Sequence, residues 1–321
     1  MNATDHSETL VSLMSVQPST VTTDDGVRIS VREWGPRTAP LTVIFAHGFC
    51  LQTSTWAAQL EYLRQHWGDT VRLVAYDQRG HGESGVAPPL SYTIDQLGCD
   101  MQAVLDAVAP DGPILLVGHS MGGMSILSHA RQHPEMIGSR VVGAALISTS
   151  ARGLAMAGLF PIANTPVINA VRAVSARLPL GSRPLSAVLP ALALDHITYG
   201  RGAIPKPVRS HTHRVITGTK LATCTGFLES LQHQDTSDAL ATLSTIPTFV
   251  ACGDVDYVTP LRNSIHLVSG LNRSTVFIRI PKAGHLAHLE QPAVVSEAIV
   301  ALAARSATTA GLGSVPTASV C

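Results

Sequence analysis

A serine between glycines is the residue best placed to do chemistry in this sequence. It lies in the segment GHSMG, residues 118–122, directly after the apolar run at 114–117 and before a helical pattern. A sharp strand-to-helix turn crowds the backbone around its central residue, so the flanking positions favour glycine and the serine hydroxyl projects outward. The helix that follows directs free N–H groups and partial positive charge to the same point. Ser120 is therefore the predicted nucleophile.

A serine hydroxyl is a weak nucleophile at its ordinary pKa and needs a base from elsewhere in the chain. His285 lies in the segment KAGH, residues 282–285, just after the last apolar run. Side chains at that position reach the carboxyl edge of a parallel sheet, where sites form. We predict that His285 is the base, with His288 as the alternative.

The base in turn needs a carboxylate that orients its ring and stabilises the imidazolium. The segment GDVD, residues 253–256, follows another apolar run and offers Asp254 and Asp256. Enzymes that carry their nucleophile on such a strand-turn-helix elbow place serine, aspartate and histidine in this chain order. We predict that Asp256 is the acid and that Asp254 shapes the turn.

Acyl transfer also needs hydrogen-bond donors for the oxygen that gains negative charge. The segment HGFC, residues 47–50, follows the apolar run at 41–45 and could bring the backbone N–H of Phe49 close to that of Met121. Phe49 and Met121 are therefore the predicted oxyanion-hole residues. Cys50 and Cys252 neighbour the predicted site in the sequence, and we interpret them as small buried apolar residues that need no chemical role.

No segment predicts a cofactor or a metal site. Residues 80–85, GHGESG, match the glycine pattern of dinucleotide sites, but Val-Ala-Pro-Pro follows, so no helix begins there to hold a pyrophosphate. The pairs His129 with His133 and His211 with His213 have no carboxylate or thiolate at ligand spacing. We therefore expect side-chain chemistry without a cofactor.

The elements that must position these residues alternate along the chain. Short apolar runs bounded by turn residues predict strands, several of them continuously apolar as in a buried parallel sheet, and amphipathic stretches between them predict helices. This alternation predicts an α/β fold with a mostly parallel central sheet and helices on both faces. The predicted strands are 27–34, 41–45, 71–76, 114–117, 141–148, 248–251 and 275–280, and the predicted helices are 56–66, 94–108, 121–132, 261–269 and 293–304.

One stretch interrupts the alternation and indicates an insertion in a single core. The chain has 321 residues, 45% of them hydrophobic and 14% charged, which suits one core with an inserted subdomain. From 151 to 224 it carries nine Lys and Arg against one acidic residue, a net charge of +8 in a chain whose net charge is zero. We predict a mobile N-terminal segment at 1–20, a core at 21–150 and 226–305, an inserted lid at 151–225 and a mobile tail at 306–321.

Charge and cysteine usage limit the partners and the compartment. Lys and Arg number 22, as do Asp and Glu, so the chain lacks the uniform basic field that binds nucleic acid. Residues 1–16 contain no Lys or Arg, unlike an export signal, and the uncharged runs at 112–130 and 153–171 are broken by Gly, Pro or polar residues. The five cysteines form no CxxC pair, which favours a reducing compartment. We expect a cytoplasmic protein, and its oligomeric state is not predicted.

Together these motifs resemble the α/β-hydrolase family of serine hydrolases, in its esterase-like and lipase-like branch. The resemblance covers about residues 21–304. It rests on the segments at 47–49, 77–84, 118–123 and 253–256 with Pro260, and on Gly284-His285 with Glu290 and Pro292. It implies the roles given above for Ser120, Asp256, His285, Phe49 and Met121. It also implies a lid after the sixth strand of the family, and in this chain that strand would be 141–148.

The resemblance also narrows the reaction. Epoxide hydrolases and dehalogenases of this family carry Asp at the elbow, whereas this chain has Ser120, and the C–C-bond hydrolases usually have a longer glycine-rich stretch after the first His-Gly. We expect a hydrolase of carboxylic esters with an apolar acyl group. Its basic lid would attract anionic substrates or make transient contact with anionic lipid, or would simply be solvated. The alternatives are a cofactor-free perhydrolase, haloperoxidase-like enzyme, lyase or acyltransferase, or a non-catalytic binding protein.

Overall fold

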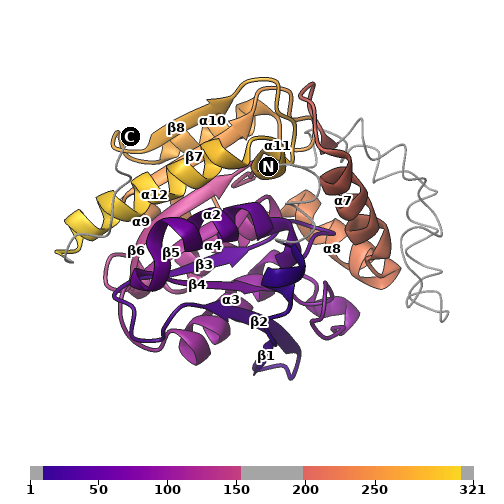
Figure 1. Ribbon diagram of the computed structural model, residues 1–321, viewed down its shortest axis with the longest axis horizontal. Coiled ribbons are helices and arrows are strands. Elements are labelled where there is room, and N and C mark those ends of the chain that lie inside the picture. The colour runs from indigo at the N-terminus through magenta and orange to yellow at the C-terminus, as the bar shows by residue number, and fades with distance from the viewer. Residues whose placement is uncertain (1–9, 153–197, 312–321) are drawn as a thin grey trace.

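Eight strands form one sheet in the computed structural model, which describes residues 10–152 and 198–311 (Figure 1). The strand order is β1-β2-β4-β3-β5-β6-β7-β8. The pairings of β1 with β2 and of β2 with β4 are antiparallel, and all other pairings are parallel. The strands are β1 (Ser19–Thr22), β2 (Arg28–Trp34), β3 (Thr42–Ala46), β4 (Arg72–Tyr76), β5 (Ile114–His119), β6 (Val141–Ile147), β7 (Thr248–Gly253) and β8 (Val276–Ile280).

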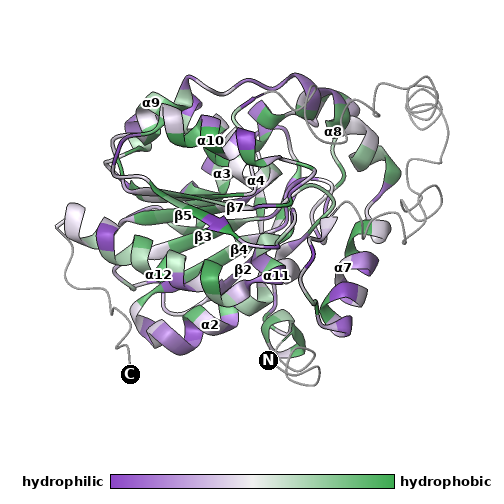
Figure 2. Ribbon diagram, turned by 90° about the horizontal axis from the view of Figure 1, so that it is seen from above, coloured by the Kyte–Doolittle hydropathy of each residue, from purple (hydrophilic) through white to green (hydrophobic). Residues whose placement is uncertain are grey.

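Helices cover both faces of this sheet, which confirms the predicted fold class. Figure 2 shows α2, α11 and α12 on one side of the strands and α3, α4, α9 and α10 on the other. Each face has its own buried apolar cluster, because side chains of a strand alternate between the two faces. The helices are α2 (Ala57–Trp67), α3 (Ile94–Val108), α4 (Met121–Gln132), α7 (Lys206–Gly218), α8 (Leu221–His233), α9 (Ala239–Leu243), α10 (Leu261–Gly270), α11 (Ala287–Glu290) and α12 (Pro292–Thr309).

The core extends beyond both of its predicted ends. The edge strand β1 begins at Ser19, and Leu13, which precedes it, is only 1% exposed within the apolar cluster under α2 and α12. At the other end, α12 continues to Thr309. β1 was not predicted, because its sequence Ser-Thr-Val-Thr has one apolar residue and gives no clear periodicity. Residues 1–9 and 312–321 lie outside the described residues.

The predicted insertion lies between β6 and β7, and the structure describes helices α7 and α8 in this part of the chain. Arg152 and Asp235 pair in an isolated antiparallel bridge, which brings together the chain after β6 and the chain after α8. The predicted end at 225 falls inside α8, which continues to His233. α7 and α8 lie beside the loops that follow β3 and β4 (Figure 1), where Thr219 and Thr223 donate hydrogen bonds to the carbonyls of Cys50 and Gly80. Residues 153–197 lie outside the described residues.

The two uncharged runs of the sequence give no membrane span in the described structure. The run at 112–130 divides into β5 and α4 at Ser120. The run at 153–171 lies outside the described residues. No helix within residues 10–152 and 198–311 is both long and apolar enough to cross a lipid bilayer.

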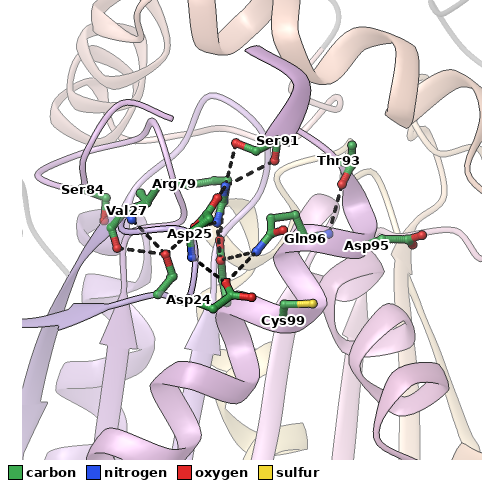
Figure 3. Close-up of polar contacts among 12 residues, drawn as sticks. Asp24, Asp25, Val27, Arg79, Ser84, Ser91, Thr93, Asp95, Gln96 and Cys99 are labelled. Carbon is green, nitrogen blue, oxygen red and sulfur yellow. Dashed lines mark hydrogen bonds and ion pairs between the residues drawn. The ribbon is translucent and has the colours of Figure 1, made fainter. Parts of the chain in front are cut away.

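A buried arginine fixes the loop after β4. The side chain of Arg79 is fully buried and donates to both carboxylate oxygens of Asp100 at 2.6 Å. It also bonds Asp25 at 2.7 and 3.0 Å and the Ser91 hydroxyl at 2.8 Å (Figure 3). The guanidinium group thus donates to three separate segments, which carry Asp100, Asp25 and Ser91. These bonds hold the loop after β4 against α3 and against the turn before β2. The hydrogen bond from Arg79 is the main cause that lowers the pKa of Asp25 to about 2.

We expect Arg79→Met to lower the free energy of unfolding by about 3 to 5 kcal/mol, because it leaves the buried carboxylate of Asp100 unpaired. Asp25→Asn is the matched control, and since the Asp25 side chain is 29% exposed its loss should be smaller. The folded pKa of Asp25 lies below the unfolded value, so its contribution is present above about pH 4 and disappears as the pH falls toward 2. Urea unfolding of the three proteins at pH 7 and near pH 3 measures both effects. Equal losses for the two variants at pH 7 would contradict this account.

Candidate active site

Ser120 occupies a strained turn between β5 and α4. Its backbone angles are φ 51° and ψ −116°, a conformation that costs a non-glycine residue about 1 to 3 kcal/mol. Two neighbours on the adjacent strand end hold it there. The Ser120 N–H donates to the carbonyl of Ile147 at 2.9 Å, and the Thr149 hydroxyl donates to the Ser120 carbonyl at 2.7 Å.

The glycines of the elbow are required by close backbone approach. A Cβ atom at Gly122 would lie 2.1 Å from the carbonyl oxygen of Ala46 at the end of β3. A Cβ atom at Gly118 would lie 2.5 Å from the carbonyl oxygen of Gly122. Both contacts are with backbone, which cannot move aside as a flexible side chain would. The predicted strand-turn-helix motif is thus present, with Ser120 at its tip.

The structure brings the three predicted residues together at the carboxyl edge of the sheet. Ser120 follows β5, Asp256 follows β7 and His285 follows β8. The distance from His285 Nε2 to Ser120 Oγ is 3.0 Å, and His285 Nδ1 lies 3.0 and 3.2 Å from the two carboxylate oxygens of Asp256. All three side chains are buried. Such distances allow one continuous chain of hydrogen bonds, in which Ser120 donates to His285 and His285 donates to Asp256.

Asp256 is held in place by hydrogen bonds from the turn around it. One carboxylate oxygen accepts from the N–H groups of Val258 and Thr259 at 2.8 and 2.9 Å, and the other accepts from the Thr259 hydroxyl at 2.8 Å. Asp254 faces elsewhere, because its carboxylate accepts the Lys282 N–H at 2.7 Å and pairs with Arg279 at 3.7 Å. The geometry thus distinguishes the two aspartates, which the sequence could separate only by chain order.

The alternative base, His288, lies behind the site. Its ring packs 4.7 Å from Trp56 and 4.2 Å from His119, and neither ring nitrogen has a hydrogen-bond partner among the described residues. Burial lowers the pKa of His288 to about 3, so the ring is neutral. It therefore acts as a packed core residue, whereas His285 has both contacts that a base needs.

The loop after β3 packs directly against Ser120. A Cβ atom at Gly48 would lie 2.6 Å from His119 Nδ1 and 3.2 Å from the Cβ of Ser120, and Phe49 is the next residue of this loop. His47 anchors this loop. Burial lowers its pKa to about 4, and because Nε2 accepts the Gln78 N–H at 2.9 Å, the single ring proton lies on Nδ1 and is donated to the Gly48 carbonyl at 2.8 Å.

Met121 supplies the second predicted donor position. It is the first residue of α4, so its N–H has no acceptor within the helix, and its side chain is fully buried. Phe49 and Met121 thus lie on the two segments that flank Ser120.

Sequence reasoning missed His119 as a supporting residue. Its Nε2 lies 2.9 Å from the carbonyl oxygen of His285, and burial lowers the pKa of His119 well below its usual value. The ring is therefore neutral, and we assign its proton to Nε2, which donates to that carbonyl and fixes the backbone of the residue that carries the base. A signal existed in the sequence, since His119 adjoins Ser120 at a strand end, but its ring direction depends on the fold.

Glu290 links the His285 loop to the insertion. Its carboxylate accepts the N–H of Gly284 at 2.8 Å and the N–H of Gly200 at 2.9 Å. Burial raises the pKa of Glu290. The His285 loop is thus fixed from the side of the insertion as well as from the sheet.

The glycine-rich segment at 80–85 wraps around a carboxylate of this chain. Asp77 accepts the N–H groups of Thr53 at 2.7 Å and Glu83 at 2.9 Å. Gly82, with φ 50°, lies so close that a Cβ atom there would be 2.1 Å from Asp77 Oδ2. The pattern that resembles a dinucleotide site is therefore a turn that supports the loop after β4. Within the described residues, no cluster of three or more His, Cys, Asp or Glu side chains has the geometry of a metal site.

Comparison with known proteins places the chain in a family. Residues 43–298 match the model of the alpha/beta hydrolase family. A bifunctional esterase/perhydrolase of Acinetobacter calcoaceticus is 36% identical over 36% of this chain and 39% of its own length. A 3-oxoadipate enol-lactonase of Acinetobacter baylyi is 29% identical over 89% of this chain and 96% of its own length.

A solved structure supports the same placement. A thermophilic esterase from Thermogutta terrifontis has a TM-score of 0.66 and 25% identity, with 88% of this chain and 97% of that chain covered. The alignments to the first curated relatives span less than half of those proteins' lengths. The family model, by contrast, matches most of this chain, with the elbow and both loops that carry Asp256 and His285 inside the matched residues. This chain therefore belongs to the alpha/beta hydrolase family.

Proposed function

We propose that this protein is a serine hydrolase that cleaves carboxylic esters, with Ser120 as nucleophile, His285 as general base and Asp256 as its partner. The observation that carries the proposal is the hydrogen-bonded chain from Ser120 Oγ through both ring nitrogens of His285 to Asp256. That arrangement serves to take the proton from a serine hydroxyl and to stabilise the imidazolium that results. The esterase and lactonase relatives act on the same class of bond, as their names state.

The reaction proceeds in two symmetrical halves. Ser120 Oγ attacks the ester carbonyl while its proton passes to His285 Nε2. The tetrahedral intermediate collapses, the C–O bond to the alcohol breaks, and His285 returns the proton to the leaving oxygen. Water then attacks the acyl-enzyme with His285 again as base, which releases the acid and restores Ser120.

Phe49 and Met121 are the proposed donors to the tetrahedral oxyanion. Met121 has an N–H without an intrahelical acceptor, and Phe49 lies on the loop that packs against Ser120. Removal of one such donor typically costs about 2.7 to 4 kcal/mol of transition-state stabilisation. The base contributes only about 10² to 10⁴ in rate, so these donors and substrate placement supply the larger part.

The proposed acyl group is apolar. An apolar cluster joins the loop after β3, the His285 loop and the insertion, and Phe49 packs against it. Its buried members are Cys50, Leu51, Tyr199, Val208, Ile216, Cys224, Leu286 and Leu289. Exposed basic side chains of the insertion, Arg201, Lys206, Arg214 and Lys220, are the proposed attraction for anionic substrates or lipid surfaces.

The second candidate reaction is perhydrolysis, which uses the same acyl-enzyme. Hydrogen peroxide in place of water would release a peracid. The relative that favours this candidate is named an esterase/perhydrolase and is 36% identical in the aligned segment. A non-catalytic binding protein is the remaining alternative, and the hydrogen-bonded triad argues against it.

One experiment separates these functions. We expect hydrolysis of uncharged acetyl, butyryl and octanoyl esters, with kcat/KM rising with acyl length. For an anionic ester, we expect kcat/KM to decrease at high salt, because mobile ions screen the basic side chains of the insertion. Added hydrogen peroxide should leave most of the product as free acid. If peracid is the main product, the enzyme is a perhydrolase rather than a hydrolase. If the rates depend on neither acyl length nor salt, the preference for an apolar acyl group and the attraction by the basic side chains are both wrong, and those side chains are simply solvated. If the protein shows neither turnover nor labelling by a fluorophosphonate probe, a binding protein is favoured.

A further inference from the structure

Two thiols from distant parts of the sequence meet beside the candidate active site. Cys50 Sγ and Cys224 Sγ lie 3.4 Å apart, although the residues are 174 positions apart in the chain. Cys50 follows Phe49 on the loop after β3, and Cys224 is in the first turn of α8 in the insertion. Both residues are buried, at 5% and 6% exposure, and both are free thiols.

The surrounding contacts fix the two segments against each other independently of the sulfur atoms. The Thr219 hydroxyl lies between the carbonyl oxygens of Cys50 at 3.3 Å and Val215 at 3.2 Å, and the Thr223 hydroxyl donates to the Gly80 carbonyl at 3.0 Å. The Cys50 N–H donates to His81 Nε2 at 3.1 Å. Because these bonds hold both backbone segments in place, the two cysteines stay neighbours in the fold.

We propose that Cys50 and Cys224 are a redox modification site, at which a two-electron oxidant of the hydroperoxide class converts the pair into a disulfide that joins the insertion to the loop carrying Phe49. With hydrogen peroxide as the oxidant, one sulfur attacks an oxygen atom, the O–O bond breaks, the thiol proton passes to the leaving oxygen, and a sulfenic acid and one water result. The second sulfur then attacks the first, the S–S bond forms, and the hydroxyl leaves with the second proton as water. Two thiols are oxidised by two electrons and one peroxide is reduced to two waters.

The geometry requires a small movement. A disulfide has an S–S distance of about 2.05 Å, so the sulfur atoms must approach by about 1.4 Å. The hydrogen bond with Cys224 and burial raise the pKa of Cys50 well above its usual value, so Cys50 keeps its proton in the resting pair. In a reducing compartment the pair rests as two thiols, and a pulse of oxidant would cross-link it.

The test uses the full chain, reduced, freed of reductant and then treated with hydrogen peroxide under native conditions. We expect the intact mass to fall by two hydrogens, non-reducing peptide mapping to give a cross-link between the Cys50 and Cys224 peptides, and dithiothreitol to reverse both. The oxidised protein should also have a Tm several degrees above that of the reduced protein, because the cross-link restricts the unfolded chain.

Matched variants make the assignment specific. A chain with Cys99→Ser, Cys252→Ser and Cys321→Ser keeps only the pair and should behave as the parent does, whereas Cys224→Ser should show neither the cross-link nor the rise in Tm. A cross-link between other cysteines, or sulfinic acid at Cys50 or Cys224 without a cross-link, or no change under excess peroxide, overturns the proposal. These readouts need no turnover, so they stand apart from failure of the proposed ester hydrolysis.

Discussion

Ser120→Ala is expected to lower kcat for ester hydrolysis by about 10⁶-fold, since loss of the nucleophile from such a triad leaves only binding and oxyanion stabilisation. Within residues 10–152 and 198–311 the Ser120 hydroxyl hydrogen-bonds only with His285, so its removal should leave the fold and the Tm nearly unchanged. Steady-state kinetics with a butyryl ester measures the loss, and a fluorophosphonate probe reports the nucleophile directly.

Ser139→Ala is the matched control for this prediction. Ser139 is exposed in the loop before β6, and among the described residues its hydroxyl hydrogen-bonds only with the Glu135 carbonyl. Its substitution should change neither turnover nor labelling. Labelling that persists in Ser120→Ala and disappears in another serine variant would show that a different residue is the nucleophile.

Asp256→Asn is expected to lower kcat by about 10⁴-fold while the triad geometry is kept. The carboxylate accepts a hydrogen bond from His285 Nδ1, and this places the imidazole's bare Nε2 toward Ser120. An amide at this position can turn its NH₂ group to His285 Nδ1 and so favour the tautomer with the proton on Nε2, which cannot accept the serine proton. The loss should appear in kcat and in kcat/KM equally, because this interaction matters in the transition state.

Asp254→Asn separates the role of Asp256 from a general effect of charge in the same turn. Asp254 contacts the Lys282 N–H and Arg279 rather than His285, so its substitution should reduce kcat by no more than about tenfold, equivalent to about 1.4 kcal/mol. The measurement is kcat and kcat/KM across the pH range for both variants. If Asp254→Asn costs as much as Asp256→Asn, the assignment of the acid fails.

Local patterns in the sequence were sufficient for most of the fold. The short apolar runs that predicted strands correspond to β2 through β8, and the predicted helix at 94–108 has the bounds of α3. Strands and helices of this kind depend on residues a few positions apart, so their periodicity is visible in the chain. β1 was missed because an edge strand with polar side chains is stabilised by pairing with β2, a partner that periodicity does not reveal.

The predicted insertion rests on a change in composition, and the pairing of its two ends gave no signal in the sequence. Nine basic residues against one acidic residue marked its presence. The bridge between Arg152 and Asp235 depends on two segments far apart in the chain, so no local signal placed its end.

The sequence by itself determined which side chains were available and in what order the chain presents them: an elbow serine between glycines, an aspartate and a histidine after later strands, and the loop with Phe49. Only the tertiary structure decided which of them meet. The contact of Ser120 with His285 spans 165 positions, and the contact of Cys50 with Cys224 spans 174. Contacts between residues so far apart in the chain depend on strand order and on the packing of α8 against the core. Both are set by the sum of many non-local contacts rather than by any short segment.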